Sequence, residues 1–291
     1  MRKVNDLSHT HLPLPLRRVR IDFEGVPFAW HPSRPNLGGA ANAVSWAAVV
    51  FEKRLCAAFR EALPLIDDLY LVAECEAFIA QEATHSRVHK EHVRALVEMH
   101  PGLDGLLGEL EGLAERHLSR LDLIERLAFG ATVEGWLAPL GHYLVAERER
   151  LFAGADIRVS ALFLWHFCEE IEHRSTALKL YRHLRAQSGA PWYLRQRAAL
   201  KTLKLSREGS RLISHYFKRA GLGSAGRVEL PLGAPSAKLF SGLVASHLPG
   251  HDTGGAASPD WAQHYLSRIQ KGLGPVEALS GNSEVERSGV I

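Results

Sequence analysis

Apolar residues recur at three- and four-residue spacings through most of residues 40–221, which is the period of amphipathic helices. Asp67 and Asp68 are candidate N-caps, and Pro101-Gly102 is a candidate stop signal. The pattern predicts long helices at residues 40–62, 67–99, 119–152 and 157–187, a shorter one at 103–117 and a basic one at 191–219. Long helices joined by short links predict an all-α fold built on a four-helix bundle.

Both flanks of this helical region have a different composition. Residues 1–39 are rich in proline, glycine and arginine, and VRIDFEGVPFAW predicts a short strand or an extended arm. After residue 221 the chain becomes rich in small residues and proline, with short helices predicted at 236–247 and 259–271 and a frayed end. We therefore expect an N-terminal arm (1–39), a bundle with an added helix (40–221) and a partly irregular extension (222–291).

Composition and charge narrow the function classes. Lys plus Arg number 35 and Asp plus Glu 32 among 291 residues, a balance that argues against nucleic acid as a partner. No stretch reaches the roughly 18 apolar residues of a membrane span, and the first residues lack the apolar core of a signal peptide. Three cysteines without CxxC spacing fit a reducing cytoplasm, so we expect a cytoplasmic protein. The unusual feature is the histidine content, at 16.

Glu52 and Glu134 stand on apolar helix faces. Glu134 is the only formally charged residue between Arg126 and Glu147. A lone ionised carboxylate there costs several kcal/mol unless it is paired or ligates a metal. Pairing with arginine is the simpler explanation, but the arginines nearby in sequence project from other helix faces. We therefore interpret both glutamates as buried ligands.

Two Glu-x-x-His motifs accompany these glutamates. Residues three apart are neighbours on a helix face, so Glu82 and His85 present a carboxylate and an imidazole together, as do Glu170 and His173. Random placement gives about one such pair in a chain of this composition, so the number alone proves nothing. The order is informative: a buried Glu, a Glu-x-x-His, a second buried Glu and a second Glu-x-x-His, each on its own helix.

This ordered set resembles the ligands of the ferritin-like di-iron carboxylate proteins. The segments NAVSWAAVVFE, FIAQEATHSRVH and HFCEEIEHR also resemble the bacterial family of predicted metal-dependent hydrolases, over residues 17–220. The resemblance implies two metal ions, with Glu82 and Glu170 as bridges. Glu52, Glu82 and His85 are assigned to one ion, and the other ion takes Glu134, Glu170 and His173.

Charge and ligand type suit this assignment. Four carboxylates balance two divalent cations, so the buried cluster is close to neutral. Oxygen and imidazole ligands suit iron and manganese, with zinc as an alternative. Of these metals, we expect iron to be the one that the protein binds.

Four neighbouring residues are further candidates. In the class resembled, the residue before the second Glu-x-x-His often reaches the first histidine, so Glu169 is expected to orient His85 rather than to face solvent. Gln81 holds the equivalent place in the other half and is a candidate to orient His173. His89 and His166 lie one turn from the motifs and are candidate extra ligands, although a satisfied core histidine is the simpler explanation for each.

Three functions are compatible with such a centre. We favour an oxidase or oxygenase that uses O2 to oxidise a small organic substrate, because four anionic ligands weaken Lewis acidity and favour high-valent iron. An electron donor protein and a homodimer are compatible with that interpretation. The alternative is a metal-dependent hydrolase with a metal-bridging water, as the family's name says. The third is iron binding without catalysis.

Overall fold

The computed structural model describes residues 14–223, 234–246, 248 and 257–287. Within these ranges the chain forms helices joined by turns and extended segments, with no strand, which confirms the all-α prediction. None of the helices in the described ranges is long and apolar enough to cross a membrane. Residues 1–13 of the predicted arm, parts of the predicted extension and the last four residues lie outside the description.

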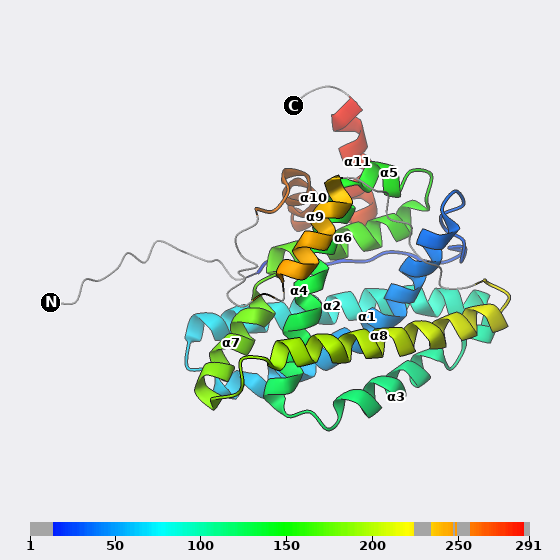
Figure 1. Cartoon of the computed structure of the whole chain (residues 1–291). Coiled ribbons are helices and arrows are strands. Elements are labelled where there is room, and N and C mark those ends of the chain that lie inside the picture. Colours follow the sequence, from blue (N-terminus) through cyan, green and yellow to red (C-terminus); the bar gives the residue numbers. More distant parts are fainter. Residues whose placement is uncertain (1–13, 224–233, 247, 249–256, 288–291) are drawn as a thin grey trace.

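Four helices enclose the centre of the molecule. They are α1 (Pro35–Ala62), α2 (Leu69–Met99), α4 (Leu123–Ala146) and α6 (Ile157–His173). Packing between them closes a ring: α1 contacts α2 and α4, and α6 contacts the same two helices (Figure 1). Side chains that point inward from all four helices therefore meet in one place.

The remaining helices cover this ring. One side carries α3 (Leu106–Leu118) and α8 (Leu194–Arg219), while α7 (Thr176–Ser188) packs on α2 and α4. The other side carries α5 (Arg148–Leu151), α9 (Ala234–Ala245), α10 (Asp260–Gln270) and α11 (Pro275–Arg287). Figure 1 shows α9, α10 and α11 gathered near α6, away from α3.

Several helix boundaries differ from the sequence prediction. The first helix, α1, begins at Pro35 inside the predicted arm, and α3 and α8 each begin three residues later than expected. The helix expected at 119–152 begins only at Leu123, because Asp122 and Glu125 form a capping box, and a turn at Glu147 separates it from α5. The helix expected at 157–187 is interrupted after His173, where no glycine or proline marks the break. Fraying was expected over the last 15 residues, but the first of them are ordered in α11, since Ala278 is fully buried in the core beside α6.

An extended segment, residues 14–34, crosses α2 and α6 without forming a strand, and we call it the strap. Inward and outward positions alternate along it, with Val19, Ile21 and Phe23 buried. Side chains of the helices hold its backbone: Arg87 of α2 donates to the Val19 carbonyl at 2.7 Å, and Arg158 of α6 donates to the Glu24 carbonyl at 2.7 Å. The strap therefore places its inward side chains directly over the ring.

Candidate metal centre

Side chains from α1, α2, α4 and α6 meet inside the ring. All six predicted ligands are there, with His166 as a seventh member, and none is more than 3% exposed. We call these residues the cluster: Glu52, Glu82, His85, Glu134, His166, Glu170 and His173. The helical period explains the convergence, because each residue lies on the inward face of its helix.

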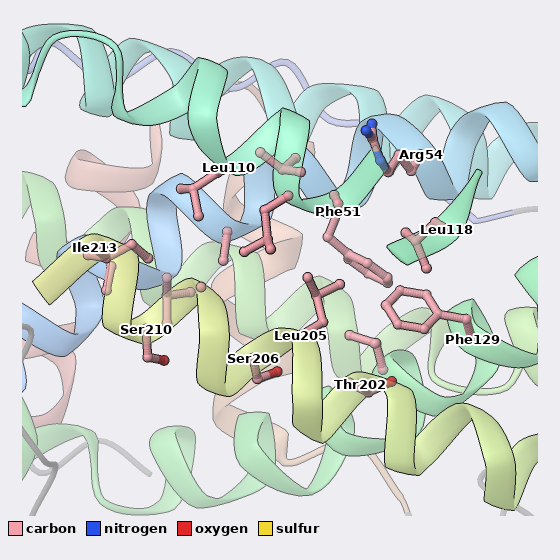
Figure 2. A pocket seen from close by; sticks show the side chains of 18 of the residues that line it. Phe51, Arg54, Leu110, Leu118, Phe129, Thr202, Leu205, Ser206, Ser210 and Ile213 are labelled. Carbon is pink, nitrogen blue, oxygen red and sulfur yellow. The ribbon is translucent and has the colours of Figure 1, made fainter. Parts of the chain in front are cut away.

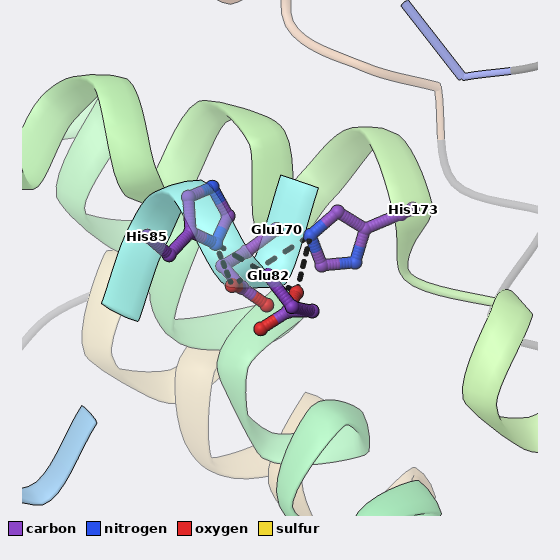
Figure 3. A group of neighbouring side chains, drawn as sticks. All are labelled: Glu82, His85, Glu170 and His173. Carbon is purple, nitrogen blue, oxygen red and sulfur yellow. Dashed lines mark ion pairs between the residues drawn. The ribbon is translucent and has the colours of Figure 1, made fainter. Parts of the chain in front are cut away.

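Two groups of ligand atoms can be distinguished within the cluster. In the first, Glu82, His85, Glu170 and His173 each offer one atom, and these atoms lie within 4.8 Å of one another (Figure 3). His173 Nε2 is 3.1 Å from Glu82 Oε1, and His85 Nδ1 is 3.5 Å from Glu170 Oε1. The two carboxylates thus lie between the two imidazoles, where bridging ligands are expected.

The second group joins Glu52, His85 and His166, again with one atom each within 4.8 Å. His166 Nε2 is 2.8 Å from Glu170 Oε1 and 3.7 Å from Glu52 Oε1. Glu134 lies at the opposite end, with Oε2 3.6 Å from His173 Nδ1. His166 therefore lies against the predicted ligands, and both of its ring nitrogens have hydrogen-bond partners, which fits an extra ligand as well as a satisfied core histidine.

The cluster contains many buried polar atoms without hydrogen-bond partners. Buried polar groups are normally paired, so unpaired atoms concentrated at one point need a reason. The unpaired atoms are Oε2 of Glu52, both carboxylate oxygens of Glu82 and Glu134, Oε2 of Glu170, Nδ1 of His85 and both ring nitrogens of His173. Carboxylate oxygens and imidazole nitrogens facing one space fit divalent cations such as iron, manganese or zinc.

Crowded carboxylates also have unusual proton affinities in the metal-free protein. Burial and the negative charge of Glu82 raise the pKa of Glu52 well above its usual range. Burial and the charges of Glu170 and Glu82 do the same to the pKa of Glu134. Burial acts in the same direction on Glu170, but neighbouring histidines, His173 first, hold its pKa well below the usual range. Without a cation, the cluster must therefore hold protons to limit its negative charge.

Glu169 lies behind the cluster and contacts His85. Its Oε2 is 2.9 Å from His85 Nε2, and its Oε1 accepts a 2.8 Å hydrogen bond from Arg17 of the strap. Burial alone would raise the pKa of Glu169, but His85 and Arg17 lower it. An ionised carboxylate only accepts hydrogen bonds, so Nε2 of His85 carries a proton and Nδ1 is the ring nitrogen that faces the cluster. In the metal-free protein burial lowers the pKa of His85, but its hydrogen bonds to Glu169, Glu170 and Glu82 raise it well above the usual value.

The sequence interpretation missed Arg17. It is 7% exposed, donates to both Glu169 and Glu172 at 2.8 Å, and donates through Nε to the carbonyl of Leu266 on α10 at 3.3 Å. One signal was present: Arg17 occupies an inward position of the alternation that buries Val19 and Ile21. An arginine at such a position requires a buried acidic partner.

The expectation for Gln81 requires correction. Its amide donates to the Pro15 carbonyl at 3.0 Å and to Glu172 Oε2 at 3.2 Å, and it makes no hydrogen bond to His173. The reason is the strap, which crosses α2 at this point and supplies a carbonyl closer to the amide. Gln81 therefore anchors the strap, while the ring of His173 packs edge-on against Phe78 at 4.8 Å.

His89 hydrogen-bonds to His166 of the cluster and makes no hydrogen bond to the six predicted ligands. Its Nε2 is 2.6 Å from Nδ1 of His166, and its Nδ1 is 3.0 Å from the hydroxyl of Ser45 on α1. The same hydroxyl is 2.9 Å from Nδ1 of His92. Of the two candidate extra ligands, His166 belongs to the cluster and His89 lies directly behind it.

A large apolar groove lies elsewhere, with a volume of about 400 Å³ (Figure 2). Its walls come from α1, α3, α4 and α8, and include Phe51, Val133, Leu205 and Ile213. Phe51 and Val133 are the chain neighbours of Glu52 and Glu134, but no member of the cluster lines the groove. It therefore lies on other faces of α1 and α4, and the cluster itself is closed to solvent.

Fold and site together define an α-helical protein with a buried glutamate–histidine centre that can hold metal ions. The model of one family, described as "Predicted metal-dependent hydrolase", matches residues 15–215, and the chain belongs to this family. The match includes the whole cluster and Arg17. Comparison with curated proteins and with solved structures found no match.

Proposed function

We propose that the cluster binds two divalent metal ions and that the protein is a hydrolase of a small-molecule substrate. The observation that carries the proposal is the set of unpaired carboxylate and imidazole atoms buried at one point. The family's description favours hydrolysis over the oxidation that the ligand charges first suggested. Glu82 and Glu170 lie between His85 and His173, so they would be the carboxylates shared by the two ions.

The chemistry follows from the donor set. Bound divalent ions supply Lewis acidity and lower the pKa of a coordinated water, which suits hydrolysis of an ester, amide or phosphoryl bond. The four cluster glutamates neutralise the ions, while Glu169 keeps the lone pair of His85 Nδ1 directed inward. Because the cluster is enclosed in this conformation, a substrate reaches it only after local opening of the surrounding helices.

Metal content is the direct test. The wild-type protein is loaded with zinc, manganese or ferrous iron under argon, dialysed, and its bound metal is measured by mass spectrometry. We expect about two ions per chain, with loss of both in a Glu82→Ala, Glu170→Ala double variant. Glu98→Ala is the matched control, because Glu98 is an exposed glutamate on the same helix as Glu82. Metal-free wild-type protein after all three loadings would contradict the proposal.

A hydrolytic role is tested on the loaded protein with panels of esters, amides and phosphoesters. We expect turnover of one class that stops on removal of the metal with a chelator and returns when the metal is added back. The Glu98→Ala control retains this turnover, and the double variant loses it. Stoichiometric metal without turnover of any panel would count against hydrolysis while leaving metal binding intact.

Oxidation remains a second candidate because of two features of the cluster. Four anionic ligands weaken Lewis acidity, and an enclosed centre admits a small gas more readily than an extended substrate. The ferrous protein, mixed with oxygen in a stopped-flow spectrometer, separates the two functions. A transient visible absorbance that is absent from the Glu82→Ala, Glu170→Ala variant would favour oxidation, and iron inert to oxygen would favour hydrolysis.

A further inference from the structure

A continuous chain of hydrogen bonds leads from the cluster into the protein interior. Its members are His166 of α6, His89 and His92 of α2, and Ser45 of α1. The distances between successive partners are 2.6, 3.0 and 2.9 Å. At the inner end, Nε2 of His166 faces Glu170 at 2.8 Å, and at the outer end Nε2 of His92 has no partner. We call these four residues the relay.

Burial restricts the protonation of the relay. Ser45, His89 and His92 are fully buried and His166 is 3% exposed. Phe23 packs beside His92 and Phe163 beside His89, with ring centroids 5.0 and 5.6 Å apart. An imidazolium in such surroundings is strongly disfavoured, so the outer members are neutral and each has one N–H donor and one acceptor nitrogen.

Two proton arrangements satisfy every bond in the relay and also use the hydroxyl proton of Ser45. In the outward arrangement, Nδ1–H of His166 donates to His89, Nδ1–H of His89 donates to Ser45, and the Ser45 hydroxyl donates to Nδ1 of His92. In the inward arrangement each bond is reversed, and Nε2–H of His166 donates to Glu170. A mixed arrangement at the bond between His166 and His89 would place two lone pairs or two N–H groups face to face. An arrangement in which Ser45 accepts from both His89 and His92 would leave the buried Ser45 hydroxyl proton without an acceptor in the relay.

The outward arrangement leaves Nε2 of His166 as a lone pair directed at Glu52 and Glu170, which is the form a metal ligand needs. We propose that His166 binds metal through Nε2 and that His89, Ser45 and His92 are positioning residues that set its tautomer. This inference rests on the proposed metal binding. Loading the centre displaces the Nε2 proton of His166 to water, and each relay proton shifts one bond toward the cluster. His92 takes up one proton on Nε2 from water, so no member changes its charge.

The tautomer of His92 gives a readout that does not depend on activity. Nitrogen-15 histidine spectra are recorded on the full-length protein without metal and with zinc, which is diamagnetic, and His92 is assigned from the signal lost in a His92→Gln variant. We expect Nδ1–H in the metal-free protein and Nε2–H after zinc binding. Zinc bound at wild-type stoichiometry with an unchanged His92 tautomer would overturn the relay and leave the metal site standing.

Zinc affinity tests the same inference by mutation. Ser45→Ala breaks the relay, and we expect about tenfold weaker zinc binding together with loss of the His92 switch. Ser45→Thr keeps a hydroxyl and is expected to restore the switch. Ser160→Ala is the matched control: Ser160 is also buried, but its hydroxyl donates only to the Asp156 carbonyl of its own helix. Equal affinities for Ser45→Ala and Ser160→Ala would contradict the inference, and absence of zinc from the wild-type protein would remove the proposed function with it.

Discussion

Glu169 is a buried carboxylate whose two oxygens serve different partners. Oε2 faces His85 of the cluster, and Oε1 faces Arg17 of the strap. The residue touches the candidate ligand from behind, so it acts on the centre through the orientation and basicity of one imidazole. Burial alone would raise the pKa of Glu169, but the hydrogen bond and charge of His85, followed by those of Arg17, lower it.

Removing the negative charge of Glu169 should weaken metal binding. We expect Glu169→Gln to lower zinc affinity about 10- to 100-fold, because a neutral amide supports His85 less well than a carboxylate. Competition with a chromogenic chelator measures the change. Glu172→Gln is the matched control, since Glu172 also accepts from Arg17 but makes no contact with His85. Equal losses in the two variants would indicate that Arg17, rather than His85, mediates the effect.

His92 makes the stability of the metal-free protein pH-dependent. Burial lowers its pKa to about 3, whereas an unfolded histidine titrates near 6.5. Between these values the unfolded chain binds a proton that the native protein does not, so this contribution is present above about pH 6.5 and is lost as the pH falls. We expect the protonation of His92 in the unfolded chain to lower the free energy of unfolding by about 2 kcal/mol between pH 7 and pH 5.

Urea unfolding of the metal-free protein at pH 7 and pH 5 measures this contribution of His92 to the free energy of unfolding. The wild type should lose more free energy of unfolding over that interval than His92→Gln, by about 2 kcal/mol. The comparison concerns the difference between the two pH values, so a general destabilisation by the substitution does not affect it. Identical pH dependence in the two proteins would mean that His92 titrates normally in the native state.

Helical period was sufficient to predict most of the elements and to bring the six candidate ligands to one place. Glu52 and Glu134 were identifiable because a charged residue on an apolar face needs a partner. The break after His173 was not predictable, because Arg174 and Ser175 both keep helical backbone angles and only the helix direction changes. The partners of Gln81, Arg17 and His166 lie on segments that are distant in the sequence. These contacts depend on how the strap and the helices cross, and the crossing geometry cannot be predicted from the residues around each position.

The close approach of α4 and α6 depends on Gly141. A Cβ atom there would lie 2.8 Å from the Phe167 carbonyl oxygen and 3.1 Å from Ile171 Cγ1. We expect Gly141→Ala to lower the free energy of unfolding by about 1–3 kcal/mol, because a backbone oxygen cannot move aside as a flexible side chain can. The measurement is urea denaturation.

A matched glycine separates packing from helix propensity. Gly108 of α3 is exposed, and a Cβ atom there meets nothing within 4 Å. Gly108→Ala should therefore stabilise the protein by up to about 1 kcal/mol, the difference in helix propensity between the two residues. Stabilisation by both substitutions would show that α4 and α6 separate easily.

On the scale of the whole molecule, the extension after the ring is part of the core. Tyr265 of α10 is fully buried, and its hydroxyl donates to the Pro275 carbonyl at 3.0 Å. Tyr265 belongs to the same part of the hydrophobic core as Val19 and Ile21 of the strap and Phe163 of α6. The strap, α6 and α10 are thus stabilised together.

Truncating Tyr265 should destabilise the folded protein and lower the midpoint of its main unfolding transition. We expect Tyr265→Ala to cost about 3–5 kcal/mol, in the range of other large aromatic truncations, and to shift the midpoint followed by circular dichroism. His264→Ala, at the exposed neighbouring position, should change stability by less than about 0.5 kcal/mol. A separate early transition with an unchanged main midpoint would mean that α10 unfolds independently.

The hydrogen bond from Arg17 to the Leu266 carbonyl joins residues 249 positions apart. A ribosome that has released residues up to about Gly221 has supplied every member of the cluster, but α10 is not yet made. During synthesis the nascent chain therefore has its candidate ligands before it has the contact that secures the arginine behind Glu169. The support of His85 by Glu169 and Arg17 is therefore complete only once residue 266 has been synthesised and α10 has packed against the strap.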